Sequence, residues 1–160
     1  MKKSLIIFVL LAIAGMTTLS YHWVHQDRVA YRRGESSFAA GDYGRAIRYL
    51  APLQEKGFRE KGVALHLGMA YLAVGDVPKA LPLYEKQVAQ EPGDPFSVHA
   101  LAGLYTRAGR FDEAIGLYRR LLLVRPQDPS VRIFLARALA GAGRFEEAVG
   151  QYRRALGDEP

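Results

Sequence analysis

Histidines are the residues of this sequence best suited to chemistry, because it contains no cysteine. His22 and His25 are three positions apart near the amino end, a spacing that could hold a metal ion or a haem iron. His66 and His99 fall at similar places in a repeating pattern and could approach each other. Neither pair has an adjacent carboxylate or a third ligand, which a metal site needs. We therefore predict no metal and no cofactor, an interfacial role for the first pair and polar contacts to a partner for the second.

Two pairs of acidic residues have the composition of a catalytic carboxylate site but not its context. Asp112-Glu113 and Glu146-Glu147 lie 34 residues apart. Each pair stands at the expected start of a helix, where negative charge complements the helix dipole. No nucleophile stands beside a candidate base anywhere in the sequence. The sequence therefore predicts a protein that is not an enzyme.

The net charge of +6 invites comparison with nucleic-acid-binding proteins. The basic residues, however, are dispersed among acidic ones rather than gathered in a block. The pairs Arg119-Arg120 and Arg153-Arg154 recur at the same place of a repeat, which is typical of a solvated helix face. We therefore predict no nucleic-acid partner.

The first 26 residues have the character of a membrane segment. Lys2 and Lys3 precede an uncharged, largely apolar run that continues to Val24. About 20 helical residues suffice to cross the hydrocarbon layer. Tyr21 and Trp23 fall where an aromatic belt would meet the lipid headgroups. The sequence thus predicts an uncleaved signal anchor, a single transmembrane helix within residues 1–26.

A cleaved secretory signal is the alternative reading of the same segment. Ala12-Ile13-Ala14 resembles a cleavage site, but only Leu5 to Leu11 would remain as the hydrophobic stretch. Arg28, Arg32 and Arg33 on the far side nearly balance the basic amino end, so charge alone hardly fixes the orientation. Short amino-terminal tails most often stay in the cytoplasm. We therefore expect a single-pass protein of the bacterial inner membrane with its repeats in the periplasm.

The rest of the sequence is a tandem repeat. Gly41, Gly75, Gly109 and Gly143 are separated by 34 residues every time, and each begins the same short pattern. A glycine suits a tight turn after a first helix. An apolar residue two places later is expected to fill the angle between the two helices of a unit: Tyr43, Val77, Phe111 and Phe145. A small residue five places after the glycine lets those helices approach closely: Ala46, Ala80, Ala114 and Ala148.

Other repeated positions mark where each unit ends and begins. Leu50, Tyr84, Tyr118 and Tyr152 occupy one place of the second helices, and the units close at Pro92, Pro126 and Pro160. Proline cannot continue a helix. Asp94-Pro95 and Asp128-Pro129 have the form of an N-cap followed by the first helical residue.

This pattern resembles the tetratricopeptide repeat family over about residues 27–160. The resemblance implies an all-α fold: four helix–turn–helix repeats (27–60, 61–94, 95–128 and 129–160) stacked as a right-handed superhelix with a groove along one side. The first unit departs most from the pattern, with Arg33 and Ser37 in place of Leu and Tyr, and Phe58 in place of the closing Pro. Pro52 predicts that its second helix bends or ends early, and Pro82 removes one backbone donor from the next unit.

The resemblance also implies a binding surface, because peptide-binding members of the family line their groove with the first helix of each repeat. The matching positions here are strongly apolar for a surface that faces water, which suits a partner's helix or extended segment. Some of these side chains could instead pack between repeats. The candidate groove residues are Tyr31, Arg32, Glu35, Phe38, Leu65, His66, Met69, Leu72, Phe96, His99, Thr106, Arg107, Ile133, Phe134 and Arg137.

Family members that bind chaperones hold a terminal carboxylate with a clamp of Lys, Arg and Asn on these helices. The matching positions here carry none of those residues; they are Tyr31, Glu35, His66, Phe96 and Ala100. We therefore expect no recognition of chaperone tails of that kind.

The leading functional hypothesis is a protein-binding scaffold that recruits or assembles a complex of the bacterial envelope. An accessory subunit of a membrane enzyme or transporter, acting through the spanning helix, is the alternative, as is a soluble periplasmic repeat protein after signal cleavage. Val149, Tyr152 and Leu156 form an apolar stripe on the last second helix. A terminal repeat needs a polar outer face. The stripe therefore predicts self-association or docking through the carboxyl-terminal repeat.

Overall fold

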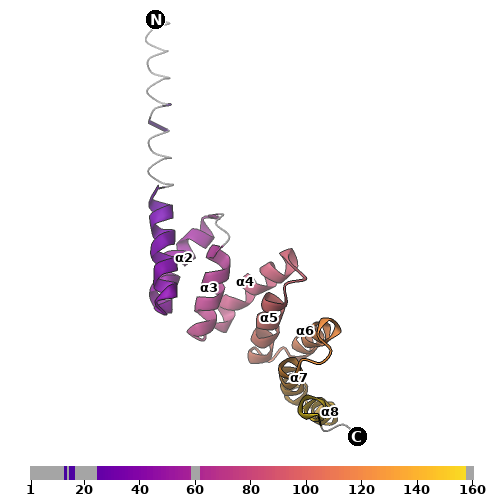
Figure 1. Ribbon diagram of the computed structural model, residues 1–160. Helices are drawn as coiled ribbons and strands as arrows, with labels where there is room; N and C mark the ends of the chain where they lie inside the picture. The colour runs from indigo at the N-terminus through magenta and orange to yellow at the C-terminus, as the bar shows by residue number, and fades with distance from the viewer. Residues whose placement is uncertain (1–12, 14, 17–24, 59–61, 158–160) are drawn as a thin grey trace, which may run out of the picture. The chain divides into compact units, whose positions relative to one another are not determined.

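The computed structural model describes residues 13, 15–16, 25–58 and 62–157, and every regular element among them is a helix. Residues 25–39 form the first of these helices. It is followed by α2 (Tyr43–Glu55), α3 (Gly62–Ala73), α4 (Val77–Gln90), α5 (Pro95–Arg107), α6 (Phe111–Val124), α7 (Pro129–Gly141) and α8 (Phe145–Leu156) (Figure 1). The chain divides into two compact units, residues 1–70 and 71–160, with the boundary inside α3.

The turn between the two helices of each repeat depends on a glycine in the left-handed region. Gly109 has a φ of 75° and follows α5. Its N–H donates to the carbonyl of Thr106, and the N–H of Arg110 donates to the carbonyl of Tyr105. These bonds satisfy carbonyl groups that the end of a helix leaves without partners. The glycines at 41, 75 and 143 adopt the same conformation, which confirms the predicted turns.

Aspartates cap the helices as the sequence predicts. The Asp94 carboxylate accepts hydrogen bonds from the N–H groups of Phe96 and Ser97 at 3.2 and 3.0 Å. Asp128 does the same for Ser130 and Val131. A proline follows each of these aspartates as the first helical residue, where its missing N–H costs nothing. The acidic pairs lie in the first turns of α6 and α8, as expected.

The core is built from the small and aromatic positions of the repeat. The four repeat alanines, Ala46, Ala80, Ala114 and Ala148, are all buried. In the unit of residues 71–160, consecutive helices from α4 to α8 pack against one another (Figure 1). Tyr84 and Tyr118 are buried at the equivalent place of α4 and α6. The Tyr84 hydroxyl has no hydrogen-bond partner in the described part of the chain, and burial raises the pKa of Tyr84 to about 12.

Two prolines lie inside helices, and Phe145 lies at the surface. The second helix of the first repeat, α2, continues through Pro52 and ends at Glu55, one repeat position earlier than α4 ends. Likewise, α4 continues through Pro82. The expectation that Phe145 fills an angle between helices is wrong, because 67% of this residue is exposed. Its counterpart Phe111 lies against α7, whereas no described helix follows α8 to cover Phe145.

The predicted membrane anchor falls almost entirely on residues outside those described. Among the residues that are described, none belongs to a helix that is both long and apolar enough to span a bilayer. His22, Tyr21 and Trp23 lie outside the described residues as well.

Candidate functional site

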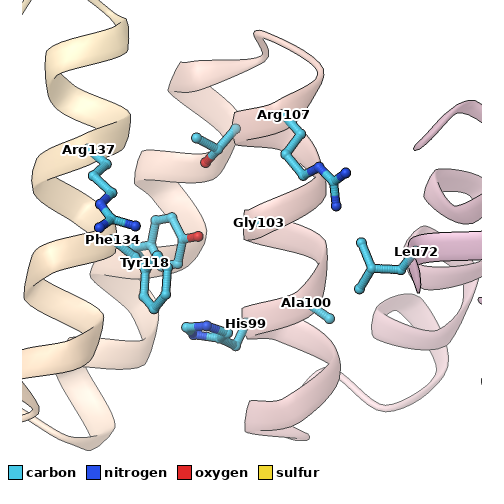
Figure 2. Close-up of a pocket in the computed structure, with 9 residues that line it drawn as sticks. Leu72, His99, Ala100, Gly103, Arg107, Tyr118, Phe134 and Arg137 are labelled. Atoms are coloured by element: carbon cyan, nitrogen blue, oxygen red, sulfur yellow. The ribbon is translucent and has the colours of Figure 1, made fainter. Parts of the chain in front are cut away.

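A pocket of about 370 Å³ opens within the unit of residues 71–160. The last residues of α3 contribute to it, and α5, α6 and α7 form the remainder (Figure 2). Its lining residues are Leu72, His99, Ala100, Gly103, Thr106, Arg107, Tyr118, Phe134 and Arg137. The volume is at the lower end of the roughly 300–1,000 Å³ that is usual for binding sites in proteins.

Three rings form the inner wall of this pocket. The His99 imidazole meets the Phe134 ring edge to face, with ring centroids 4.9 Å apart and planes at 81°. It meets Tyr118 in the same manner at 5.8 Å. Tyr118 and Phe134 are nearly parallel, 6.0 Å apart. Edge-to-face and offset-parallel contacts are the favoured arrangements of aromatic rings, so the three rings stabilise one another in this wall.

Tyr118 reaches the pocket from the second helix of its repeat and lies opposite Gly103 of the first helix. A Cβ atom added at Gly103 would lie 3.8 Å from the Tyr118 hydroxyl oxygen. Burial raises the pKa of Tyr118, although a hydrogen bond with Thr106 opposes the shift. The Thr106 hydroxyl in turn donates to the Ala102 carbonyl at 2.9 Å. Tyr118 is therefore a neutral hydrogen-bonding group within an otherwise apolar wall.

His99 is also held in its neutral form. Burial lowers the pKa of His99, and the negative charge of Asp128 opposes that shift. The Asp128 carboxylate is already engaged with two N–H groups at the start of α7. The centre of the pocket is thus uncharged at neutral pH, and its formal positive charges lie on Arg107 and Arg137.

Six of the predicted groove residues meet in this one pocket: Leu72, His99, Thr106, Arg107, Phe134 and Arg137. Two others in the same unit do not line it. Phe96 is 54% exposed near the start of α5, and Ile133 is half-buried on α7. The periodic pattern therefore does not distinguish the residues that line this pocket from their neighbours on the same helices.

The remaining predicted groove residues lie in or near the first unit, where most of them are half-buried: Tyr31, Arg32, Glu35, Phe38, Leu65, His66 and Met69, of which Arg32 alone is exposed. His66 Nδ1 is 2.6 Å from Glu35 Oε1, and the Phe38 ring stacks on the imidazole at 4.6 Å. The expectation that His66 has no nearby carboxylate is therefore wrong. Adjacent first helices bring together residues 31 positions apart, which a search for local spacing does not detect.

Sequence reasoning missed three lining residues. The repeat pattern places Tyr118 on a second helix and outside the groove. The residue is 1% exposed, yet its ring contributes to the pocket wall. Ala100 and Gly103 were not assigned to the groove. The signal that could have found them is the small side chain at both positions of α5, because a larger one would fill the space in front of Tyr118.

The carboxyl-terminal helix presents the predicted apolar stripe. On α8, the exposed fractions of Val149, Tyr152 and Leu156 are 49%, 36% and 72%. The equivalent residues of α6 are buried or half-buried, and Ile115 and Tyr118 are almost fully so. The next described helix, α7, covers this apolar face on α6, whereas no described helix covers the same face of α8.

In the described part of the chain, no three His, Asp or Glu residues lie close enough together to hold a metal ion. The acidic residues of the first turns are instead paired with arginines. Arg110 Nε lies 2.8 Å from Glu113 Oε1, and Arg144 Nε lies 2.7 Å from Glu147 Oε1.

Paired helices of 12 to 14 residues, a glycine turn at every repeat and a pocket on the first helices define a helical-repeat protein of the protein-binding class. Family models of the tetratricopeptide repeat match residues 42–126 and residues 99–160. The chain belongs to the tetratricopeptide repeat family. Its repeats indicate that the protein is a scaffold for protein–protein interactions.

Several solved structures named MamA are similar to this chain. MamA AMB-1 is 30% identical over 82% of this chain and 72% of that chain, with a TM-score of 0.69. MamA MSR-1 is also 30% identical, covering 82% and 76%, with a TM-score of 0.68. MamA from Desulfovibrio magneticus RS-1 shares the fold, with a TM-score of 0.71 at 18% identity over 82% and 74%. No curated protein matches the chain.

Proposed function

We propose that this chain is a non-enzymatic scaffold that binds a partner protein through the first helices of its repeats. The observation that carries the proposal is the pocket, in which six side chains chosen from the repeat pattern meet around a wall of three rings. Two guanidinium groups at its edge add hydrogen-bond donors to an apolar interior. An apolar pocket with a few convergent polar groups is the usual form of a binding site.

A substitution at an exposed groove position tests this proposal. Phe96→Arg places a charge on α5 at a site that is already open to solvent. We expect the full-length chain to lose partner capture in mild-detergent co-purification while its helical circular dichroism stays unchanged. Leu123→Arg is the matched control, because Leu123 is 83% exposed on α6 and is not one of the predicted groove residues. Unchanged capture by Phe96→Arg, or unfolding of that variant, would contradict the assigned face.

The proposal includes a location. The amino-terminal apolar segment anchors the protein in the bacterial inner membrane, and the repeats lie in the periplasm, where they recruit or assemble an envelope complex. Support comes from the uncharged run that ends at Val24 and from Tyr21 and Trp23 at its edge. Carbonate washing of membranes and mass measurement of the intact chain provide the test. Release of a chain that begins near Gly15 would argue instead for a cleaved signal.

The second candidate is an accessory subunit that acts through its amino-terminal helix. The length of the apolar run favours it, because a spanning helix can itself contact a membrane enzyme or transporter. Removal of residues 1–26 separates the two candidates. A scaffold that binds through its repeats keeps its partner, whereas an accessory subunit of this kind loses it.

A further inference from the structure

The edge of the pocket carries two arginines without acidic partners. Arg107 lies in the last turn of α5, and Arg137 lies on α7 across the pocket (Figure 2). Neither forms an ion pair within the described residues, whereas Arg110, Arg119 and Arg144 of the same unit each pair with a glutamate. Two arginines of this unit that form no ion pair among the described residues therefore lie at the pocket.

Arg137 is further positioned by an aromatic contact. Its guanidinium carbon lies 5.6 Å from the centroid of the Phe134 ring, within the range of a cation–π interaction. This contact places the guanidinium group beside the ring wall, where it forms no ion pair with a described residue. A planar guanidinium group binds a carboxylate through two parallel hydrogen bonds, which makes arginine well suited to acidic partners.

The positive charges of Arg107 and Arg137 therefore lie at the edge of a pocket whose centre is uncharged. His99, Phe134 and Tyr118 form the wall, and the small residues Ala100 and Gly103 leave space in front of it. That space suits one bulky apolar side chain rather than a whole helix, since the pocket is at the small end of the usual range.

We propose that the pocket takes a short acidic segment of a partner protein, which inserts one aromatic or branched aliphatic side chain against His99 and Phe134 and presents carboxylates to Arg107 and Arg137. This inference rests on the proposed scaffold function and specifies the chemistry of its partner. The acidic group close to His99 is Asp128, which its capping bonds hold at the start of α7. The carboxylates of the partner segment are therefore expected beside the two arginines and not beside His99.

Fluorescence polarisation with the full-length protein tests the proposal. The probe is a fluorescein-labelled peptide of sequence Gly-Glu-Asp-Phe-Asp-Glu-Gly. One control peptide carries Ala in place of Phe, and another carries Lys in place of the four acidic residues. We expect the first control to bind about tenfold more weakly or worse, and the second not to bind, because the energy of burying a ring and of a charged contact is each about 1.4 kcal/mol or more.

Protein variants locate the contact. We expect Arg107→Gln and Arg137→Gln each to weaken binding of the acidic peptide by about fivefold to tenfold. Arg125→Gln removes the same charge from an exposed site at the end of α6 that does not line this pocket, and we expect a change of less than about twofold. Circular dichroism of all three variants controls for folding.

Several results would overturn the proposal: no binding of the acidic peptide up to about 1 mM, equal binding of the lysine peptide, or an equal loss in Arg125→Gln. Tighter binding of an oligothymidylate than of the peptide would also overturn it in favour of a nucleic acid. If the peptide fails but Phe96→Arg still abolishes partner capture, only the partner chemistry is wrong. If capture survives Phe96→Arg, the scaffold assignment itself fails.

Discussion

The ring of Phe111, at the start of α6, occupies the space in front of Gly141, the last residue of α7. A Cβ atom at residue 141 would overlap the ring, so the close approach of the two helices depends on this glycine. The contact joins the second helix of one repeat to the first helix of the next.

Replacing Gly141 with alanine is therefore expected to destabilise the protein by about 1–3 kcal/mol, because the Phe111 ring must move out of a packed interface. The measurement is thermal unfolding by circular dichroism. Gly116→Ala in α6 is the matched control, since nothing lies near its Cβ position. There, alanine should stabilise the helix by up to about 1 kcal/mol. Similar shifts in the two variants would contradict the packing.

Two equivalent tyrosines should respond oppositely to loss of their hydroxyl groups. Thr106 is a hydrogen-bonding neighbour that acts to lower the pKa of Tyr118, whereas the buried Tyr84 hydroxyl has no partner among the described residues. The repeat places Leu72 where Thr106 would be needed for Tyr84. We expect Tyr118→Phe to cost about 1 kcal/mol in the free energy of unfolding and Tyr84→Phe to be neutral or stabilising.

Urea titrations of the two variants beside the wild type measure the difference. Alkaline pH gives a second reading, because the raised pKa of Tyr84, about 12, means that the unfolded state loses this proton first. Stability from this group is complete below pH 10 and declines as the pH rises from there towards about 12. Tyr84→Phe should lose that part of the alkaline sensitivity.

His99 should make stability depend on pH near neutrality. Burial lowers its pKa in the folded state from the ordinary value of 6.5, so the unfolded state binds the proton more readily. Stability from this group is therefore complete above that value and falls as the pH falls through it, until the lowered folded pKa is passed. The melting temperature of the wild type minus that of His99→Gln, measured between about pH 5 and pH 8, isolates the effect. A difference that grows as the pH falls would have the wrong sign.

The apolar stripe of α8 should promote association. Val149, Tyr152 and Leu156 are exposed, whereas the equivalent face of α6 is covered by α7. We expect light scattering to show concentration-dependent dimers or larger species of the wild-type chain. Tyr152→Glu combined with Leu156→Glu should remove them without loss of helix, because charge on the stripe opposes its burial. A wild-type chain that stays monomeric at high concentration would leave this face for another protein.

The sequence alone does not reveal which residues contact one another over long range. The pairing of His66 with Glu35 and the convergence of six groove residues on one pocket both depend on how neighbouring first helices align. Periodicity assigns a residue to a helix face, but it does not say which side chain of the next helix stands opposite.

The sequence by itself determined the repeat, the turns and the caps. A glycine every 34 residues, with an aspartate or a proline at fixed offsets, is local chemistry, because each acts on the backbone within a few residues of itself. Only the tertiary structure decided that Tyr118 belongs to the pocket as well as to the core, and that Phe145 is exposed while Phe111 is packed. Those outcomes depend on which helix lies next to each side chain. Equivalent positions in successive repeats therefore have different neighbours, and the sequence pattern of one repeat does not predict which of them is buried.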